Sequence, residues 1–230
     1  MAAWTLISVL ATAVLILLTA PFIGGTRAFH RLTGVWVDQL FALAGIQLEV
    51  QGWEALPESI RAGNQPVVFM STHESNLDPP VLIRAIPVQA TFISKKELIW
   101  APLVGWAAWV GGTIFLDRGK REQAKQSLRE AARRIHAGRT VVIFPEGTRT
   151  RSGRLGTFKK GGFALAQDAD VPVVPVSTTG GFRILPAGGW RLRPGTYRIV
   201  FGRPVHPADH PSREALLEAV HAEVLKLREA

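Results

Sequence analysis

The chain of 230 residues contains no cysteine and only one tyrosine. The lack of cysteine excludes disulfide bonds, a cysteine-ligated zinc site and a catalytic thiol that would carry an acyl group as a thioester. Acidic residues are also scarce: 18 Asp and Glu stand against 27 Lys and Arg, which gives a formal net charge of +9. This excess predicts an anionic partner, such as nucleic acid, an acidic lipid or a phosphorylated substrate.

The first 26 residues lack any ionisable side chain, and residues 4–23 form a nearly continuous apolar run. About 20 residues rising about 1.5 Å each match a hydrocarbon thickness of about 30 Å, so the run predicts a membrane-embedded helix. A cleaved signal peptide is the alternative. However, no Lys or Arg precedes the run, and the run is long for such a peptide.

A turn is expected where this run ends, because Pro21 is followed by a pair of glycines. A second, mostly apolar helix candidate comes next. Residues 1–45 are therefore predicted to form membrane-associated helices, which can be arranged as a two-helix hairpin. Arg27 and Arg31 follow the first apolar segment, and this placement favours a cytoplasmic location for the rest of the chain.

From residue 46 onward, short β-rich runs alternate with helical stretches. The expected strands are residues 46–52, 66–71, 89–94, 113–116, 140–144, 173–177 and 197–202. Helices are expected in a short stretch after Pro79, over residues 97–109 and 120–137, and from an N-cap at Ser212 onward. This alternation predicts one α/β domain, residues 46–230, with a mostly buried mixed sheet flanked by helices.

The segment "STHESNLDPP" at residues 71–80 separates His73 from Asp78 by five positions. Proline fits the first turn of a helix and disfavours helical conformation in the residue before it. Asp78 is therefore expected to be the N-cap of a helix that starts at Pro79, with His73 at the end of the preceding strand. The short loop between them can fold the carboxylate onto Nδ1–H of the ring, which would leave Nε2 as a base.

Three other interpretations of this segment stay open. Asp78 can simply cap a helix while His73 is a polar strand end. A metal site would use His73, Glu74 and Asp78, but no further cluster of carboxylates or histidines accompanies them. Ser71 or Ser75 as a hydrolase nucleophile lacks the G-x-S-x-G sequence of a nucleophile elbow.

Cations follow three other expected strands. The stretch "FPEGTRTRSGRLGTFKKGG" at residues 144–162 offers the hydroxyl of Thr148 and the planar guanidinium of Arg149 for phosphate. Further basic residues of the same stretch are Arg151, Arg154, Lys159 and Lys160. Lys95 and Arg118 end two more strands. Each cluster can be a solvated basic loop, but their repetition predicts one anion-binding crevice at a single edge of the sheet.

Taken together, these stretches resemble the glycerolipid acyltransferase family, of the lysophosphatidic acid acyltransferase (PlsC) type. The H-x4-D motif of that family corresponds to His73 and Asp78, and its F-P-E-G-T-R motif corresponds to residues 144–149. An I-D-R-like triplet corresponds to residues 116–118, and a V-P-x-x-P-V element to residues 171–176.

This resemblance covers about residues 50–205, with the motifs in the family's order. One departure is Thr72, where relatives often carry Asn before the histidine. The resemblance implies the glycerolipid acyltransferase fold and a membrane-bound O-acyltransferase with its active site on the cytoplasmic face. The enzyme would move a fatty acyl group from acyl-CoA or acyl-carrier protein to the sn-2 hydroxyl of lysophosphatidic acid, giving phosphatidic acid.

The resemblance also implies roles for individual residues. His73 would be the general base, oriented by Asp78, without an acyl-enzyme. No cofactor is implied, because acyl-CoA or acyl-carrier protein is a substrate. The residues implied to bind the glycerol phosphate acceptor are Glu146, Gly147, Thr148, Arg149, Lys95 and Arg118. Glu146 can instead be structural, paired with a nearby cation.

Several alternatives remain at this stage. Lys159 and Lys160 can meet the donor's phosphates or an anionic membrane surface. Trp100, Trp106 and Trp109 can line an acyl channel, sit in the headgroup layer or pack in the core. The acceptor can be another lyso-lipid, such as a lyso-ornithine lipid or a lysophospholipid, or the protein can bind lipid without catalysis. Nucleic acid is not an expected partner, because no recognised reader motif occurs.

Overall fold

A computed structural model describes residues 2–117 and 121–229. The α-helices are α1 (Ala2–Ile23), α2 (Gly25–Ala44), α3 (Glu58–Arg61), α4 (Asp78–Ala85), α5 (Val104–Val110), α6 (Arg121–His136), α7 (Lys160–Asp168), α8 (Gly181–Ile184) and α9 (Arg213–Glu229). The strands are β1 (Ile46–Gln51), β2 (Val68–Ser71), β3 (Ala90–Lys95), β4 (Ile114–Leu116), β5 (Thr140–Ile143), β6 (Val173–Thr179) and β7 (Gly195–Phe201). Two short 3₁₀ helices are η1 (Lys96–Trp100) and η2 (Pro207–Asp209).

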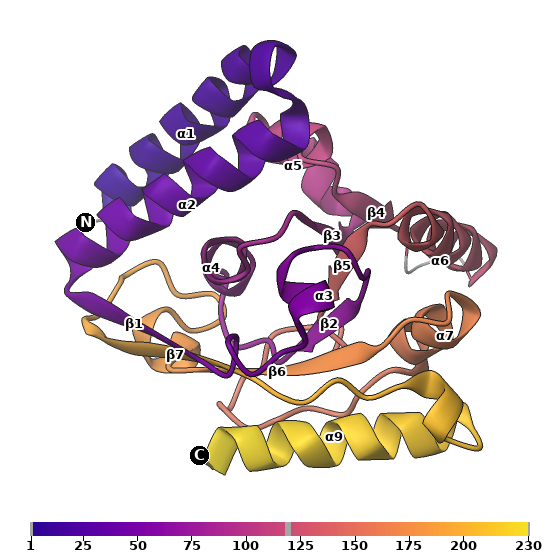
Figure 1. Cartoon of the computed structure of the whole chain (residues 1–230). Helices are drawn as coiled ribbons and strands as arrows, with labels where there is room; N and C mark the ends of the chain where they lie inside the picture. Colours follow the sequence, from indigo (N-terminus) through magenta and orange to yellow (C-terminus); the bar gives the residue numbers. More distant parts are fainter. Residues whose placement is uncertain (1, 118–120, 230) are drawn as a thin grey trace.

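The strands form one 7-stranded sheet in the order β1-β7-β6-β2-β5-β3-β4 (Figure 1). Only the β6–β7 pair is antiparallel, so the sheet is mixed. The predicted α/β fold with a buried mixed sheet is confirmed, and every predicted strand is present with its ends within two residues. Parallel neighbours bring their carboxyl-terminal ends to one edge of the sheet, where loops can form a site.

Helices cover both faces of the sheet. Side chains alternate along β2: Phe69 packs with α2, α3 and α4, whereas Val68 and Met70 pack with α6, α7 and α9. Figure 1 shows α4 and α9 on opposite sides of the sheet. Because both faces are covered, the central strands are continuously apolar, and each buried large side chain contributes about 1.5–3 kcal/mol.

Helices α1 and α2 lie side by side at one corner of the molecule (Figure 1). Gly24 joins them with a φ of 86°, a conformation that a residue with a Cβ rarely adopts. Trp36 donates a hydrogen bond from Nε1 to Ser8 Oγ at 3.0 Å, which ties the two helices together. Residues Ala3–Ile23 are long and apolar enough to cross a membrane, with a mean hydropathy of 2.5, and little of this helix is buried. The membrane association and the domain boundary at residue 45 stay predictions.

The helix predicted over residues 97–109 is wrong. The structure has η1 and α5 in its place, separated by Pro102. Ala101, the residue before this proline, is extended with a φ of −73° and a ψ of 109°, because the proline ring disfavours helical conformation there. The sequence patterns also do not predict α7, whose first turn contains two glycines and so has low intrinsic helix propensity.

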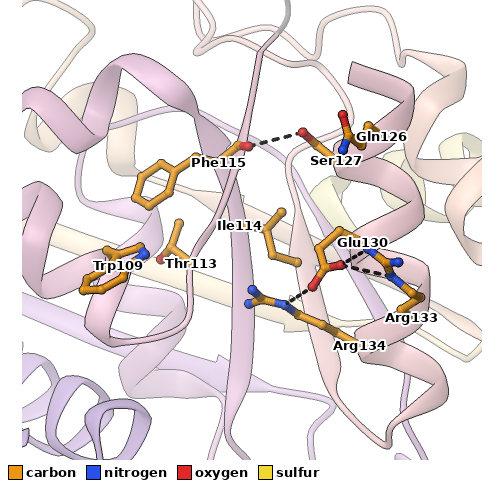
Figure 2. Close-up of a pocket in the computed structure, with 9 residues that line it drawn as sticks. All are labelled: Trp109, Thr113, Ile114, Phe115, Gln126, Ser127, Glu130, Arg133 and Arg134. Atoms are coloured by element: carbon orange, nitrogen blue, oxygen red, sulfur yellow. Dashed lines mark hydrogen bonds and ion pairs between the residues drawn. The ribbon is translucent and has the colours of Figure 1, made fainter. Parts of the chain in front are cut away.

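Strand β4 forms one edge of the sheet, and α6 covers it (Figure 2). Ser127 Oγ donates to the carbonyl of Phe115 at 3.3 Å, and Arg134 Nη1 donates to the carbonyl of Gly112 at 2.8 Å. Glu130 balances the Arg134 charge, with a 3.2 Å Nε–Oε1 contact. The cavity of about 350 Å³ between β4 and α6 is therefore bordered by side chains that bond to backbone carbonyls along this covered edge of the sheet.

Candidate active site

The carboxyl-terminal ends of β2, β3 and β5 open into a cavity of about 870 Å³. The residues predicted from the sequence that line it are His73, Lys95, Gly147, Thr148 and Arg149. We call these five residues the polar end of the cavity. Asp78 and Glu146 are buried and do not line the cavity. Arg118, which was also predicted to bind the acceptor, lies outside the described residues. Loops far apart in the sequence thus converge at one edge of the sheet.

The His73 ring is held from two directions. Its Nδ1 lies 2.6 Å from Oδ2 of Asp78, and its face stacks on Phe144 with centroids 4.0 Å apart. Its side chain remains 16% exposed and lines the cavity. No described residue hydrogen-bonds Nε2. With Asp78 accepting from Nδ1–H, the ring offers Nε2 as the free basic nitrogen.

Asp78 is completely buried, at 0% exposure, and its carboxylate accepts four hydrogen bonds. Besides the His73 ring, Oδ2 accepts from the backbone N–H groups of Glu74 at 2.7 Å and Ser75 at 2.8 Å. The phenol of Tyr197 donates to Oδ1. Burial, and then the nearby Asp78, raise the pKa of Tyr197 well above its ordinary value, so the phenol keeps its proton and remains a donor.

The prediction that Asp78 is a helix N-cap is wrong. Helix α4 begins at Asp78 itself, and Leu77 is the N-cap residue. An N-cap side chain accepts from N–H groups of the helix that it starts, whereas this carboxylate accepts from N–H groups of the preceding loop. The two prolines of the first turn supply no N–H groups, so the carboxylate is available to the loop.

Neither serine of the segment faces the cavity. Ser71 Oγ donates to the carbonyl of Thr72 at 3.1 Å, and Ser75 Oγ donates to the carbonyl of Leu185 at 2.8 Å. The Glu74 carboxylate points toward Arg228 and the backbone of Phe182. Among the side chains that the structure describes, no three His, Asp or Glu are grouped to hold a metal ion.

The turn after β5 carries the second part of the polar end. Gly147 has a φ of 71°, which glycine adopts without strain, and its N–H donates to the carbonyl of Phe144 at 3.0 Å. The N–H of Thr150 donates to the carbonyl of His73 at 2.8 Å, so this turn is bonded directly to the histidine loop. A Cβ at position 147 would lie 2.8 Å from Lys159 Nζ, which puts that cation beside the turn.

Arg149 is the least satisfied side chain of the site. Its Nη1 atom is buried and has no hydrogen-bond partner among the described residues. An unpaired buried donor on a charged group costs free energy, and such atoms are rare in folded proteins. The guanidinium lines the cavity with Thr148 and the exposed Lys95, an arrangement that fits a phosphate or carboxylate ligand.

Two other lysines near these loops point elsewhere. Lys160, one of the predicted basic residues, pairs through its Nζ with Glu214 on α9 at 2.5 Å. Lys96, the neighbour of Lys95, pairs with Asp117 after β4. By contrast, Lys95 lines the polar end and Lys159 lies beside its Gly147 turn.

The Glu146 carboxylate bonds to both the loop after β2 and the loop after β5. It is 5% exposed, and its Oε1 accepts from the N–H of His73 while its Oε2 accepts from the N–H of Gly156, both at 2.8 Å. Burial raises the pKa of this carboxyl, and the two backbone donors oppose the rise. These bonds favour the structural alternative, with backbone groups in place of the expected cation. Contact between Glu146 and a substrate stays a prediction.

The opposite end of the cavity is apolar. Side chains from three helices line it, including Leu6, Val9 and Ile16 of α1, Trp36 of α2 and Ala107 of α5. The three tryptophans considered above do not line it. They are exposed on the surface, with Trp100 at 81%, so core packing does not explain them. The cavity therefore joins a basic, histidine-bearing end to a pocket suited to a hydrocarbon chain.

Sequence reasoning missed two residues of this site, Tyr197 and Arg228. Tyr197 lies in an alternating strand and Arg228 in an amphipathic helix, where each resembles an ordinary core or surface residue. Each was also far from the recognised motifs. The one available signal was that Tyr197 is the single tyrosine of the chain.

Comparison with known proteins gives a consistent result. The sequence model of the family described as "Acyltransferase" matches residues 47–179. A chloroplastic 1-acyl-sn-glycerol-3-phosphate acyltransferase of Brassica napus is 32% identical over 87% of this chain and 58% of its own length. The enzyme of that name from Pseudomonas aeruginosa is 34% identical over 75% of this chain and 63% of its own length. The chain thus spans less than two thirds of the length of these curated relatives.

A solved structure agrees over nearly the whole chain. The crystal structure of PlsC, the 1-acyl-sn-glycerophosphate acyltransferase from Thermotoga maritima, superposes with a TM-score of 0.76. The match covers 98% of this chain and 97% of that one, at 26% sequence identity. The chain belongs to the acyltransferase family.

Proposed function

We propose that the protein is a membrane-bound O-acyltransferase that converts lysophosphatidic acid to phosphatidic acid, with acyl-CoA or acyl-carrier protein as donor. The observation that carries the proposal is one cavity that contains the free Nε2 of His73, the unpaired Nη1 of Arg149 and an apolar end. The activity in the names of the relatives supports the same acceptor, a 1-acyl-glycerol 3-phosphate.

The acceptor's phosphate would bind at the polar end. Arg149 can donate from its unpaired nitrogen, while Thr148 and Lys95 line the same space. Gly147 lets the backbone approach the phosphate closely because it carries no side chain. This grip would bring the glycerol hydroxyl toward His73, which is the positioning that a two-substrate reaction requires.

The proton transfer follows from the His73–Asp78 geometry. As the acceptor hydroxyl attacks the thioester carbonyl, its proton moves to Nε2 and the Asp78 carboxylate stabilises the resulting imidazolium. The new C–O bond forms, and the tetrahedral intermediate collapses with cleavage of the C–S bond. The proton then passes from Nε2 to the departing sulfur. With no cysteine in the chain, and with the hydroxyls of Ser71 and Ser75 bonded to backbone carbonyls, direct transfer is simpler than an acyl-enzyme.

Acyl chains would occupy the apolar end, between α1, α2 and α5. Helix α1 is apolar and little buried, and Trp100 is almost fully exposed, so a bilayer would cover surfaces that are unfavourable in water. The polar end would then face the cytoplasm at the membrane surface. A site at this depth could bind a lipid acceptor without extracting it into water.

A panel of donors and acceptors tests the proposal. Purified protein in detergent or vesicles is incubated with acyl-CoA or acyl-carrier protein and with lysophosphatidate, a lyso-ornithine lipid or neutral-headgroup lysophospholipids. The lipid products are identified by mass. Phosphatidic acid is expected to be the main product, and His73→Ala should reduce its formation by about 10²–10⁴-fold without loss of folding. Preference for another lyso-lipid would overturn the acceptor assignment. Absence of acyl transfer from both donors would overturn the proposed acyltransferase activity.

A further inference from the structure

The last turn of α9 carries an arginine that reaches the candidate active site from behind. Arg228 Nη2 donates to Glu74 Oε1 at 2.9 Å and to the carbonyl of Gly153 at 3.1 Å. Its Nη1 lies 3.5 Å from the carbonyl of Thr178. The side chain is only 17% exposed, so the guanidinium is held within the protein.

These partners belong to three segments at one edge of the sheet. Glu74 lies in the loop after β2, Gly153 in the loop after β5, and Thr178 at the end of β6. The three strands are neighbours in the order β6-β2-β5. A planar guanidinium with several fixed donors can bond to all three at once, which a single ammonium group cannot do with the same geometry.

Glu74 connects this arginine to the predicted catalytic pair. Its backbone N–H donates to Asp78 Oδ2 at 2.7 Å, and its neighbour Ser75 makes a similar bond. Its side chain is buried, with Oε1 bonded to Arg228 and Oε2 accepting from the N–H of Phe182 at 3.1 Å. The backbone N–H of Glu74 therefore orients the Asp78 carboxylate, while Arg228 of α9 holds the side chain of Glu74.

We propose that Arg228 and Glu74 form a positioning pair that holds the His73 loop in register with the turn that carries Arg149. The pair touches neither the cavity nor a substrate, so its effect on catalysis is indirect. The kinetic part of the inference rests on the proposed acyltransferase function. The structural part, that α9 orders these loops, can be measured without any substrate.

Without Arg228 the Glu74 carboxylate would be buried beside Asp78, whose negative charge disfavours ionisation of Glu74. Two charged groups act on Glu74: Arg228 from α9 lowers its pKa, and Asp78 from α4 raises it. Glu74 in turn helps to raise the pKa of the Tyr197 phenol from β7. Burial raises the pKa of Glu74, while the hydrogen bonds from Phe182 and Arg228 oppose the rise. Removing Arg228 therefore leaves a carboxyl whose ionisation, as pH increases, disturbs the loop that it belongs to.

The kinetic experiment uses a double-mutant cycle in the full chain. Arg228→Ala is expected to lower kcat by about 10- to 100-fold, the range expected for a small displacement of reacting groups. The ratio of variant to wild-type kcat should fall further as pH increases. Glu74→Gln combined with Arg228→Ala should be more active than Arg228→Ala alone and should lack the added pH dependence. Additive losses, or an unchanged ratio across pH, would overturn the proposal.

Two matched variants separate positioning from general destabilisation. Lys226→Ala removes an exposed charge from the same helical turn, which pairs with Glu223 at 3.6 Å, and should leave kcat unchanged. Arg228→Lys keeps the charge but not the fork, and should fall between wild type and Arg228→Ala. If Arg228→Ala does not fold, the pH profile of Arg228→Lys and the double variant decide the question.

Amide hydrogen exchange gives a readout that is independent of activity. Arg228→Ala should accelerate exchange at the N–H groups of Glu74, Ser75 and Thr150, relative to Lys226→Ala. Faster exchange confined to α9 would overturn the positioning role. If wild-type protein acylates no acceptor while the loop amides still respond, the proposed function fails and the structural role of the pair stands.

Discussion

The histidine side and the arginine side of the cavity differ in how completely their polar atoms are bonded. On the histidine side, the buried Asp78 carboxylate accepts four hydrogen bonds and the imidazole is stacked on Phe144. On the arginine side, Arg149 keeps a buried nitrogen without a partner among the described residues, and Lys95 and Thr148 are exposed. Apart from the free Nε2 of His73, the polar atoms of the histidine side are bonded within the protein, whereas the arginine side keeps a buried donor without a partner among the described residues.

This difference separates two tasks. A group that transfers a proton works best when its orientation is fixed before the substrate arrives, because no reorganisation is then needed during the reaction. A group that binds an anion gains most when its donors are unsatisfied beforehand, because the ligand then supplies the missing bonds. Substitutions on the two sides should therefore change different quantities.

Asp78→Asn should have the largest effect. The amide loses the negative charge that stabilises the imidazolium, and its NH₂ group would face donors that now meet a carboxylate. We expect kcat to fall by about 10²–10⁴-fold, the contribution of general base catalysis. The measurement is kcat at saturating donor and acceptor, with circular dichroism as the folding control. A folded variant that retains more than a tenth of the activity would contradict the role of the pair.

Arg149→Ala should act on binding. The loss of charge-assisted hydrogen bonds, about 1.5–3 kcal/mol, should appear mainly as a higher KM for lysophosphatidate. The thermal midpoint should not fall, because the buried Nη1 that the substitution removes has no partner among the described residues. Arg149→Lys, which keeps the charge without the planar fork, is the matched control and should give an intermediate KM. A lower midpoint with unchanged KM would mean that Arg149 is structural.

Tyr197→Phe tests how much the hydrogen bond from Tyr197 to Asp78 contributes to catalysis. The substitution removes one of the four donors to Asp78 with little change in shape. A hydrogen bond to a charged group contributes about 1.5–3 kcal/mol, part of which can be replaced by the remaining donors. We expect kcat to fall by less than in Asp78→Asn, and KM for the acceptor to stay within a few-fold of wild type. A change confined to KM would contradict the assignment of Tyr197 to the histidine side.

The local parts of both sides are visible in the sequence. Two prolines after Asp78 mark the strand-to-helix turn, and the rule that parallel strands end at one edge brings His73 and Arg149 together. The error over residues 97–109 came from apolar spacing that continues across Pro102. A proline is a local signal, and Pro102 marks the point at which the predicted helix divides into η1 and α5.

The distant parts could not be predicted. Tyr197 is 119 positions from Asp78, and Arg228 is 154 positions from Glu74. Neither pairing has a local pattern, because each depends on how the sheet orders its strands and on which face α9 covers. Helical and strand periodicity indicate that a side chain faces inward or outward, but not which buried carboxylate it will meet.

The smallest expected effect is on stability. It measures how far the buried Glu146 carboxyl, which bonds to the N–H of His73, destabilises the folded protein. Burial raises the pKa of Glu146, so folding favours its neutral form more than the unfolded chain does. The stability that this group contributes is present below its unfolded pKa of about 4.5 and is lost as pH rises through the higher native pKa. In Glu146→Gln the thermal midpoint should therefore fall less steeply above pH 4.5 than in wild type, although its absolute value can be lower because an amide NH₂ would face a backbone donor. Thermal unfolding across this pH range is the measurement.

A steeper decline of the thermal midpoint in Glu146→Gln would contradict this prediction. It would show that the two backbone donors stabilise the carboxylate more than burial destabilises it, so that the buried Glu146 does not lower the stability of the protein.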